Sequence, residues 1–176
     1  MSPLLRELSW NELAGSLAWF SALLVDAVED GASVGFLPPL SCGVAGQYWM
    51  EVAQAMKTGG RILIAAYMED TLVGSVQVDL ATKPNALHRA EIQKLVVHRQ
   101  MRRRGIGRSL MAEAERLSRE AGRTLLILDT RQGDRSEVLY LSMGYKQAGV
   151  IPGYAKSASG QLDSTVLMYR NLVDSS

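Results

Sequence analysis

The segment from residue 88 to residue 129 constrains the fold of this chain more than any other. It begins with HRAEIQKLVVH, which reads as a strand, continues through the arginine- and glycine-rich loop RQMRRRGIGRSL, and closes with RTLLILD, whose centre LLIL is apolar. Between the loop and the last stretch, apolar residues recur at helical spacing until Gly122, namely Leu110, Met111, Ala114, Leu117 and Ala121. Strand, loop, helix and buried strand in this order predict a right-handed βαβ unit with parallel strands.

The flanking segments predict helices first and an antiparallel sheet afterwards. Ser9 and Glu12 stand at capping-box spacing and predict a helix over about 10–29, and a second helix is expected over about 43–58. Residues 61–68 and 71–80 predict a hairpin, and a short helix over 136–142 and strands over 145–150 and 165–171 close the chain. We therefore expect an α+β fold in one domain over residues 1–176, with a mixed, mostly antiparallel sheet flanked by helices.

Composition narrows the classes of function. The 19 basic and 18 acidic side chains give a net charge of +1, which argues against a surface built to attract nucleic acid. A single cysteine, Cys42, and only two histidines predict neither a disulfide framework nor a metal site, and fit a reducing, cytoplasmic setting. The N-terminus lacks a signal-peptide pattern, and the uncharged run from Leu13 to Val25 is too short to span a bilayer, so no membrane association is expected.

The glycine loop has the two properties that phosphate binding requires. Glycines let backbone amides approach an anion, and the start of a helix directs free amides and a positive dipole end at one point. A Walker loop is excluded because its Gly-Lys-Ser/Thr is missing, and a dinucleotide fingerprint fits poorly because its third glycine would fall at Leu110. An ordinary glycine turn with a solvated basic face, or a local nucleic-acid patch, remains as an alternative.

Arg102, Gly105 and Gly107 match the pattern Arg/Gln-x-x-Gly-x-Gly/Ala between a strand and a long amphipathic helix. The chain thereby resembles the GNAT acyltransferase superfamily, whose loop with this pattern binds the pyrophosphate of acetyl-coenzyme A (acetyl-CoA). The stretches GASVGF, KPN, RAEIQKL, LDT and PGY, spread from residue 31 to residue 154, are similar to the branch that confers tabtoxin resistance by acetylating the amine of an amino-acid-like β-lactam toxin.

The resemblance implies which residues hold acetyl-CoA as co-substrate. The pyrophosphate is expected at the loop and the start of the following helix, formed by Arg102, Arg103, Arg104, Gly105, Ile106, Gly107, Arg108 and Ser109. The backbone of Leu95, Val96 and Val97 is expected to pair with the pantetheine arm and to stabilise the charge that develops on the thioester oxygen. The sequence departs from the family at Gly133, where many members have an Asn that contacts pantetheine.

Acetyl transfer to an amine requires a base for the ammonium proton and profits from an acid for the departing thiolate. The resemblance assigns Glu91 and Asp129 as candidate bases and Tyr140 as general acid, and a sheet that splays between the two parallel strands would bring all three to one cleft. Each has an alternative: Glu91 could face solvent, Asp129 could cap a turn, and Tyr140 could simply pack its ring.

Weaker expectations concern the acceptor and the partners. Lys83, Asn85 and Arg89 could meet a substrate carboxylate, and Phe36 and Tyr154 could form walls of the pocket, although surface or packing roles suit each equally well. The expected substrate is a small amino-acid-like amine. A protein or peptide amine acetyltransferase and a non-catalytic acyl-CoA-binding module are the alternatives, and a homodimer and a monomer both stay open.

Overall fold

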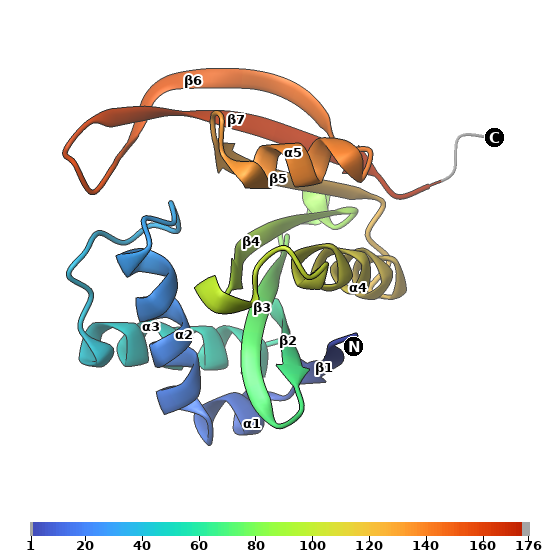
Figure 1. Cartoon of the computed structure of the whole chain (residues 1–176). Helices are drawn as coiled ribbons and strands as arrows, with labels where there is room; N and C mark the ends of the chain where they lie inside the picture. The colour runs from blue at the N-terminus through green and yellow to red at the C-terminus, as the bar shows by residue number, and fades with distance from the viewer. Residues whose placement is uncertain (1, 174–176) are drawn as a thin grey trace.

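The computed structural model describes residues 2–173. The fold is built on one seven-stranded sheet that has helices on both faces (Figure 1). The strand order is β1-β2-β3-β4-β5-β7-β6, and β4 and β5 form the one parallel pair among the described residues. The strands are β1 (Leu4–Leu8), β2 (Arg61–Met68), β3 (Thr71–Leu80), β4 (Arg89–Val97), β5 (Leu125–Arg131), β6 (Lys146–Lys156) and β7 (Leu162–Asn171). The predicted mixed sheet with a central parallel βαβ unit is confirmed.

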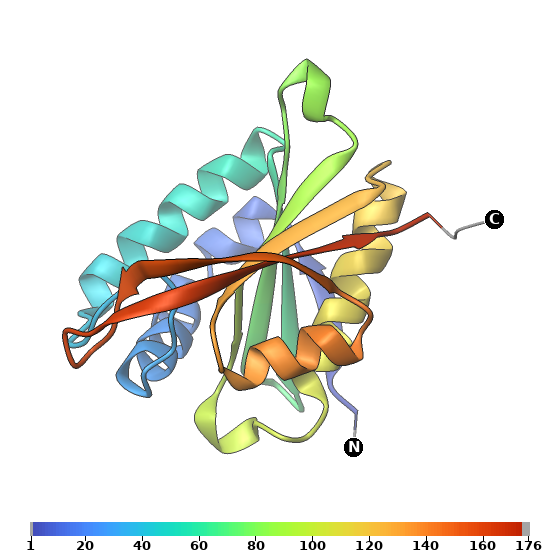
Figure 2. The ribbon, with the colours of Figure 1, turned by 90° about the horizontal axis from the view of Figure 1, so that it is seen from above.

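The helices divide between the two faces of the sheet, as the view from above shows (Figure 2). On one face, α1 (Trp10–Ala14), α2 (Leu17–Glu29) and α3 (Cys42–Lys57) enclose a core around Phe20 and Trp49. On the other face, α4 (Ile106–Glu120) and α5 (Arg135–Ser142) cover a second core to which Leu110 and Tyr140 contribute. Two short 3₁₀ turns, η1 (Pro84–Ala86) and η2 (Arg99–Met101), precede and follow β4.

The helix that the sequence predicted over 10–29 is wrong as a single element. It is divided into α1 and α2 because Gly15 ends α1 and Ser16 leaves the helical conformation, with φ −122° and ψ 15°. The capping box between Ser9 and Glu12 is present. Strand β1 was not predicted at all, since five residues at a sheet edge carry too little alternation to be recognised. The closing strands β6 and β7 extend beyond 145–150 and 165–171 to meet at the hairpin tip.

The parallel strands β4 and β5 diverge soon after they start. Their pairing runs only from Arg89 opposite Leu125 to Glu91 opposite Ile127, although both strands continue. In the same region the register of β4 against β3 shifts, because Gln77 pairs with Gln93 whereas Ser75 pairs with Val96, and Lys94 has a positive φ of 51°. This bulge bends β4 away from β5 and opens the sheet at the carboxyl ends of both strands.

Gly105 begins α4 from a left-handed conformation, with φ 80°, which is costly for any residue with a side chain. Gly74 of β3 lies behind this turn, and a β-carbon there would stand 2.9 Å from the carbonyl oxygen of Val96 and 3.1 Å from Leu110. The missing side chain of Gly74 therefore lets the first turns of α4 pack directly on β3 and β4. Of the described helices, none is long and apolar enough to cross a membrane.

Candidate active site

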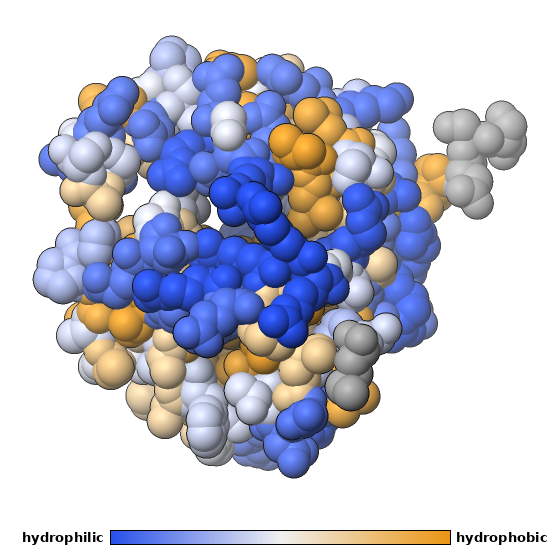
Figure 3. Space-filling model, viewed as in Figure 1, coloured by the Kyte–Doolittle hydropathy of each residue, from blue (hydrophilic) through white to orange (hydrophobic). Residues whose placement is uncertain are grey.

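The opening between β4 and β5 is the floor of a cleft of about 920 Å³. Its walls are the α2–α3 loop, the loop before α4, the first turns of α4 and α5, and the β6–β7 hairpin. Figure 3 shows a hollow below the β6–β7 hairpin, bordered largely by hydrophilic surface. A single cleft thus joins the start of α4 to the ends of β4 and β5.

Most of the residues predicted for the site line this cleft. The three candidates for catalysis, Glu91, Asp129 and Tyr140, do so from β4, β5 and α5. The predicted cofactor residues in its wall are Leu95, Val96, Val97, Arg102, Arg103, Gly105, Ile106, Gly107 and Arg108, and Tyr154 lines it among the predicted substrate contacts. Arg104 and Ser109, from the same loop and helix, do not line it.

The start of α4 has the properties of an anion site. Ser109 donates its amide to the Gly105 carbonyl at 3.0 Å, which leaves the preceding amides of the first turn, Ile106 to Arg108, without helical partners. A β-carbon on Gly107 would stand 3.4 Å from Leu139 and 4.0 Å from Leu95 and Val97, so its absence keeps the passage between α4 and α5 open. This cradle fits the pyrophosphate of a coenzyme.

The arginines of the loop play different parts. Arg102 donates from Nε to the Val97 carbonyl at 3.1 Å and forms an ion pair with Asp30, so its side chain fastens the loop to β4 and to the end of α2. Arg108 donates to the Ser142 hydroxyl at 2.6 Å. Arg103 is exposed at the cleft with a positive φ of 63°. The free backbone amides of the first turn of α4 are therefore the groups best placed to meet an anion, and Arg103 is the loop arginine at the cleft whose charge no other described side chain holds.

The edge of β4 beyond Glu91 faces the cleft without pairing to β5. Val96 and Val97 pair with Ser75 and Gly74 of β3 on the other side, so only their cleft-facing edge remains for a further extended chain. A pantetheine arm, which carries amides of its own, fits such an edge. At the position of the family's Asn, Gly133 has φ 82°, donates its amide to Glu137 at 2.7 Å and does not line the cleft.

Tyr140 is the most buried of the three candidate catalytic residues, with 6% of its surface exposed. Burial raises the pKa of its phenol above the ordinary value, and the negative charges of Asp129 and Asp134 add to the effect, so the hydroxyl remains protonated and can donate. Asp129 is exposed to the cleft and accepts a hydrogen bond from Thr165 at 2.9 Å. Glu91 is half-buried. Two carboxylates and a protonated phenol thus face one cleft, as proton transfer to and from an acceptor requires.

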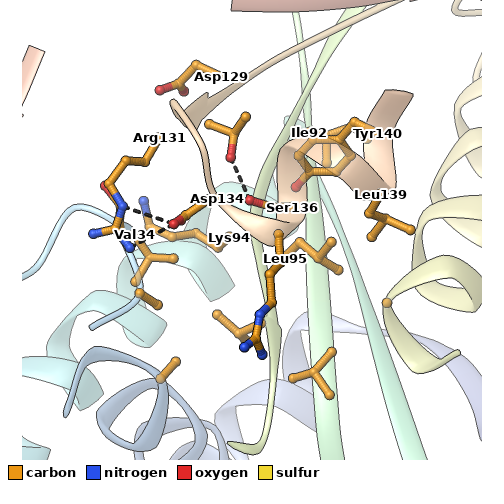
Figure 4. A pocket seen from close by; sticks show the side chains of 18 of the residues that line it. Val34, Ile92, Lys94, Leu95, Asp129, Arg131, Asp134, Ser136, Leu139 and Tyr140 are labelled. Carbon is orange, nitrogen blue, oxygen red and sulfur yellow. Dashed lines mark hydrogen bonds and ion pairs between the residues drawn. The ribbon is translucent and has the colours of Figure 1, made fainter. Parts of the chain in front are cut away.

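Two cationic residues at the cleft were missed by the sequence analysis (Figure 4). Arg131, at the end of β5, pairs with Asp134 at 2.9 Å and with Asp163 at 3.6 Å, and donates to the Gly31 carbonyl at 3.2 Å. Lys94, at the bulge of β4, also lines the cleft. A lysine in an alternating strand carries no signal that distinguishes it, because the bulge that re-aims it is formed by tertiary packing.

Four of the predicted substrate contacts lie outside the cleft. Lys83, Asn85 and Arg89 are exposed at or before the amino end of β4, whereas the cleft opens beyond Glu91 at the other end. Phe36 packs edge-on against Tyr48, with ring centroids 5.3 Å apart, and belongs to the core under α2 and α3. Among the described residues, no group of three or more His, Cys, Asp or Glu side chains could hold a metal ion.

Comparison with known proteins gives one family. The family model described as Acetyltransferase (GNAT) family matches residues 42–145, which is more than half of the chain and includes the loop, α4, β5 and α5. Among solved structures, a ribosomal-protein-alanine N-acetyltransferase from Brucella melitensis is 22% identical, with a TM-score of 0.76, and the match covers 96% of this chain and 99% of that one.

Two further solved structures were determined with the cofactor. A putative acetyltransferase from Salmonella typhimurium with acetyl-CoA is 13% identical, with a TM-score of 0.80 and coverage of 100% and 97% of the two chains. A phosphinothricin acetyltransferase from Sinorhizobium meliloti in complex with acetyl-CoA is 18% identical, with a TM-score of 0.79 and coverage of 100% and 91%. At these identities the likeness concerns the fold.

Proposed function

Because the chain belongs to the acetyltransferase (GNAT) family and is an acetyl-CoA-dependent N-acetyltransferase, we propose that it acetylates the amine of a small amino-acid-like molecule by direct transfer in a ternary complex. The observation that carries the proposal is the divergence of β4 and β5 after Glu91 and Ile127. It joins the anion cradle of α4 to two carboxylates and a phenol in one cleft. We also propose that residues 1–176 form one domain that acts in the cytoplasm.

Bound acetyl-CoA supplies the acetyl group as a thioester that an amine can attack. In the proposed reaction the first turn of α4 binds the pyrophosphate, and the free edge of β4 at Leu95 to Val97 orients the pantetheine arm. Glu91 or Asp129 accepts the proton of the substrate ammonium, directly or through water, which makes the amine nucleophilic. Tyr140, whose phenol burial keeps protonated, donates to the departing sulfur.

The contacts of Arg131 at one end of the cleft bear on the size of the acceptor. Arg131 connects β5 to the carbonyl of Gly31 in the α2–α3 loop and to Asp163 of β7, so this end is bridged rather than open along its length. A bridge of this kind suits a small molecule better than a segment of a protein chain. The structural neighbours include both a ribosomal-protein-alanine N-acetyltransferase and a phosphinothricin acetyltransferase, so the fold alone does not decide between a protein and a small molecule as acceptor.

More specifically, we propose that the substrate is a tabtoxin-like β-lactam. This proposal rests on the similarity of the stretches GASVGF, KPN, RAEIQKL, LDT and PGY to the tabtoxin-resistance branch. The test is a screen for thiol release from acetyl-CoA with free amino acids, amino-acid-like toxins, polyamines and short peptides as acceptors. Acetylation of small amino-acid-like amines with peptides inert supports the proposal. Turnover confined to peptides would replace it by the protein or peptide acetyltransferase.

A further inference from the structure

The side chain of Lys94 is a half-buried charged group that lines the cleft and has no part in the reaction above. Its Nζ lies 5.6 Å from the centre of the Tyr48 ring. A β-carbon on Gly35 would stand 3.4 Å from the same Nζ atom. Figure 4 shows Lys94 extending from β4 toward Val34 of the α2–α3 loop. The ammonium is thus held against the wall of the cleft on the side that α2 and α3 form.

Lys94 differs from the paired arginines of the cleft. Arg102 forms an ion pair with Asp30, and Arg131 forms ion pairs with Asp134 and Asp163. Within the described part of the chain, no carboxylate lies within 4.0 Å of Nζ of Lys94. A half-buried cation without a partner disfavours the folded state and leaves a position that an anion would stabilise.

Both positive and negative charges lie around Lys94, and they shift the pKa of its ammonium in opposite directions. Burial lowers the pKa of its ammonium, the positive charge of Arg61 adds to that effect, and Asp129 and Glu91 oppose it. Arg61 is held by Gln77, which accepts from its guanidinium at 3.0 Å, and by Asp79 at 3.4 Å. Tyr48, which also packs against Lys94, bonds to Gln77 through its hydroxyl. These groups fix the position of the ammonium but give it no counter-charge in contact.

The acceptor side of the cleft therefore presents opposite charges at separate points. Glu91 and Asp129 line it as carboxylates, and Lys94 lines it as a cation beside the α2–α3 loop. An α-amino acid carries an ammonium and a carboxylate on a single carbon, so it brings one group of each sign to a cleft that presents both signs. An amine that has no carboxylate would meet the carboxylates equally well but would face an unpaired ammonium at Lys94.

We infer that Lys94 binds the carboxylate of the amine substrate and thereby selects zwitterionic amino acids and related amino-acid-like molecules over amines that lack a carboxylate. This inference rests on the proposed function, because it specifies the acceptor of the same site. Lys94 acts in it as a substrate-binding and specificity residue, and it takes no part in proton transfer.

The test compares Lys94→Met with wild type on matched pairs of acceptors, each a free amino acid and its carboxamide, at saturating acetyl-CoA. Wild type should prefer the free acid. Lys94→Met should raise the KM of the free acid by about 10- to 100-fold, the range expected for loss of one charge-assisted hydrogen bond. The KM of the carboxamide, the KM of acetyl-CoA and kcat should change little, and Lys94→Arg should retain the preference for the acid.

Lys57→Met is the matched control, since Lys57 is exposed at the end of α3, its Nζ lies 4.8 Å from the centre of the Trp10 ring, and it does not line the cleft. Its kinetics should equal those of wild type. Lys94→Met should melt at the same temperature as wild type or higher, because a half-buried charge without a partner is removed. A loss of activity can then be separated from a loss of folding.

The outcomes separate the two proposals. If wild type acetylates free amino acids and Lys94→Met retains their advantage over the carboxamides, the inference about Lys94 is wrong and the proposed function stands. If Lys94→Met lowers kcat equally for acid and carboxamide, Lys94 acts in the chemistry and the inference is again wrong. If wild type acetylates only amines without a carboxylate, or peptides alone, both proposals are wrong.

Discussion

Replacement of Gly107 by alanine should change the stability of the protein and its affinity for acetyl-CoA in opposite directions. Gly107 is the second residue of α4, and an added β-carbon would meet Leu139 at 3.4 Å and Leu95 and Val97 at 4.0 Å, which are ordinary van der Waals contacts. Alanine is favoured over glycine in helices by roughly 0.5 to 1 kcal/mol. The free protein should therefore melt about 1 to 4 °C higher than wild type.

The same methyl group should weaken the binding of acetyl-CoA, because it lies in the passage where the backbone must approach the pyrophosphate. Loss of one charge-assisted hydrogen bond would raise Kd by about 10- to 100-fold. At a ligand concentration of about 100 times the wild-type Kd, bound ligand stabilises wild type by about 2.7 kcal/mol, and the variant by only about 1.4 to 0.4 kcal/mol. Calorimetric melting with and without acetyl-CoA measures both quantities.

Arg104→Ala is the control for this experiment, since Arg104 belongs to the same loop but is exposed and does not line the cleft. Removal of its charge should change Kd by less than about 5-fold. Unchanged affinity in Gly107→Ala would refute the assignment of the first turn of α4 as the pyrophosphate cradle. A parallel loss of stability and affinity would instead show that the methyl group distorts the packing of α4 on α5.

Two further predictions concern Tyr140 and Asp26. Tyr140→Phe should lower kcat about 100-fold or more with little change in the KM of acetyl-CoA. Because burial raises the pKa of the Tyr140 phenol, ionisation of this phenol should not lower the wild-type rate at any pH up to about 10. A wild-type kcat in the variant would contradict the assignment of a general acid. Burial disfavours the ionised Asp26, but hydrogen bonds from the backbone and side chain of Arg99 outweigh it and hold the pKa of the carboxyl below its ordinary value. Its contribution, about 1 kcal/mol, is present above the unfolded pKa of about 4 and is lost as pH falls through the lower folded pKa, so Asp26→Asn should reduce stability in urea at pH 7 and not at strongly acidic pH.

The sequence was sufficient for the features that local chemistry determines. A strand, a glycine loop and an amphipathic helix before an apolar strand predicted the parallel pair β4–β5, and Ser9 with Glu12 predicted the start of α1. The break at Gly15 was visible as a glycine, but an apolar pattern that continues across it favoured one helix. Propensity does not reveal where packing requires two helices.

The geometry of the acceptor side could not be predicted from the sequence, for a different reason. The bulge at Lys94 has no glycine to mark it, although this lysine has a positive φ of 51° where the register of β4 against β3 shifts. Lys83, Asn85 and Arg89 were expected at the site from local resemblance, yet they lie at or before the amino end of β4. Parallel strands that diverge form a cleft at their carboxyl ends, so side chains at the other end do not line it.

We propose that acetyl-CoA binds in the split between β4 and β5, through the backbone at the start of α4 and along the free edge of β4. Backbone amide NMR of the uniformly ¹⁵N-labelled protein, titrated with acetyl-CoA, is the decisive experiment. We expect large shift changes at Ile106, Gly107 and Arg108 and slower hydrogen exchange at Leu95 to Val97, with β1 at the far edge of the sheet unaffected. Saturable binding of acetyl-CoA that leaves both stretches unchanged would contradict it.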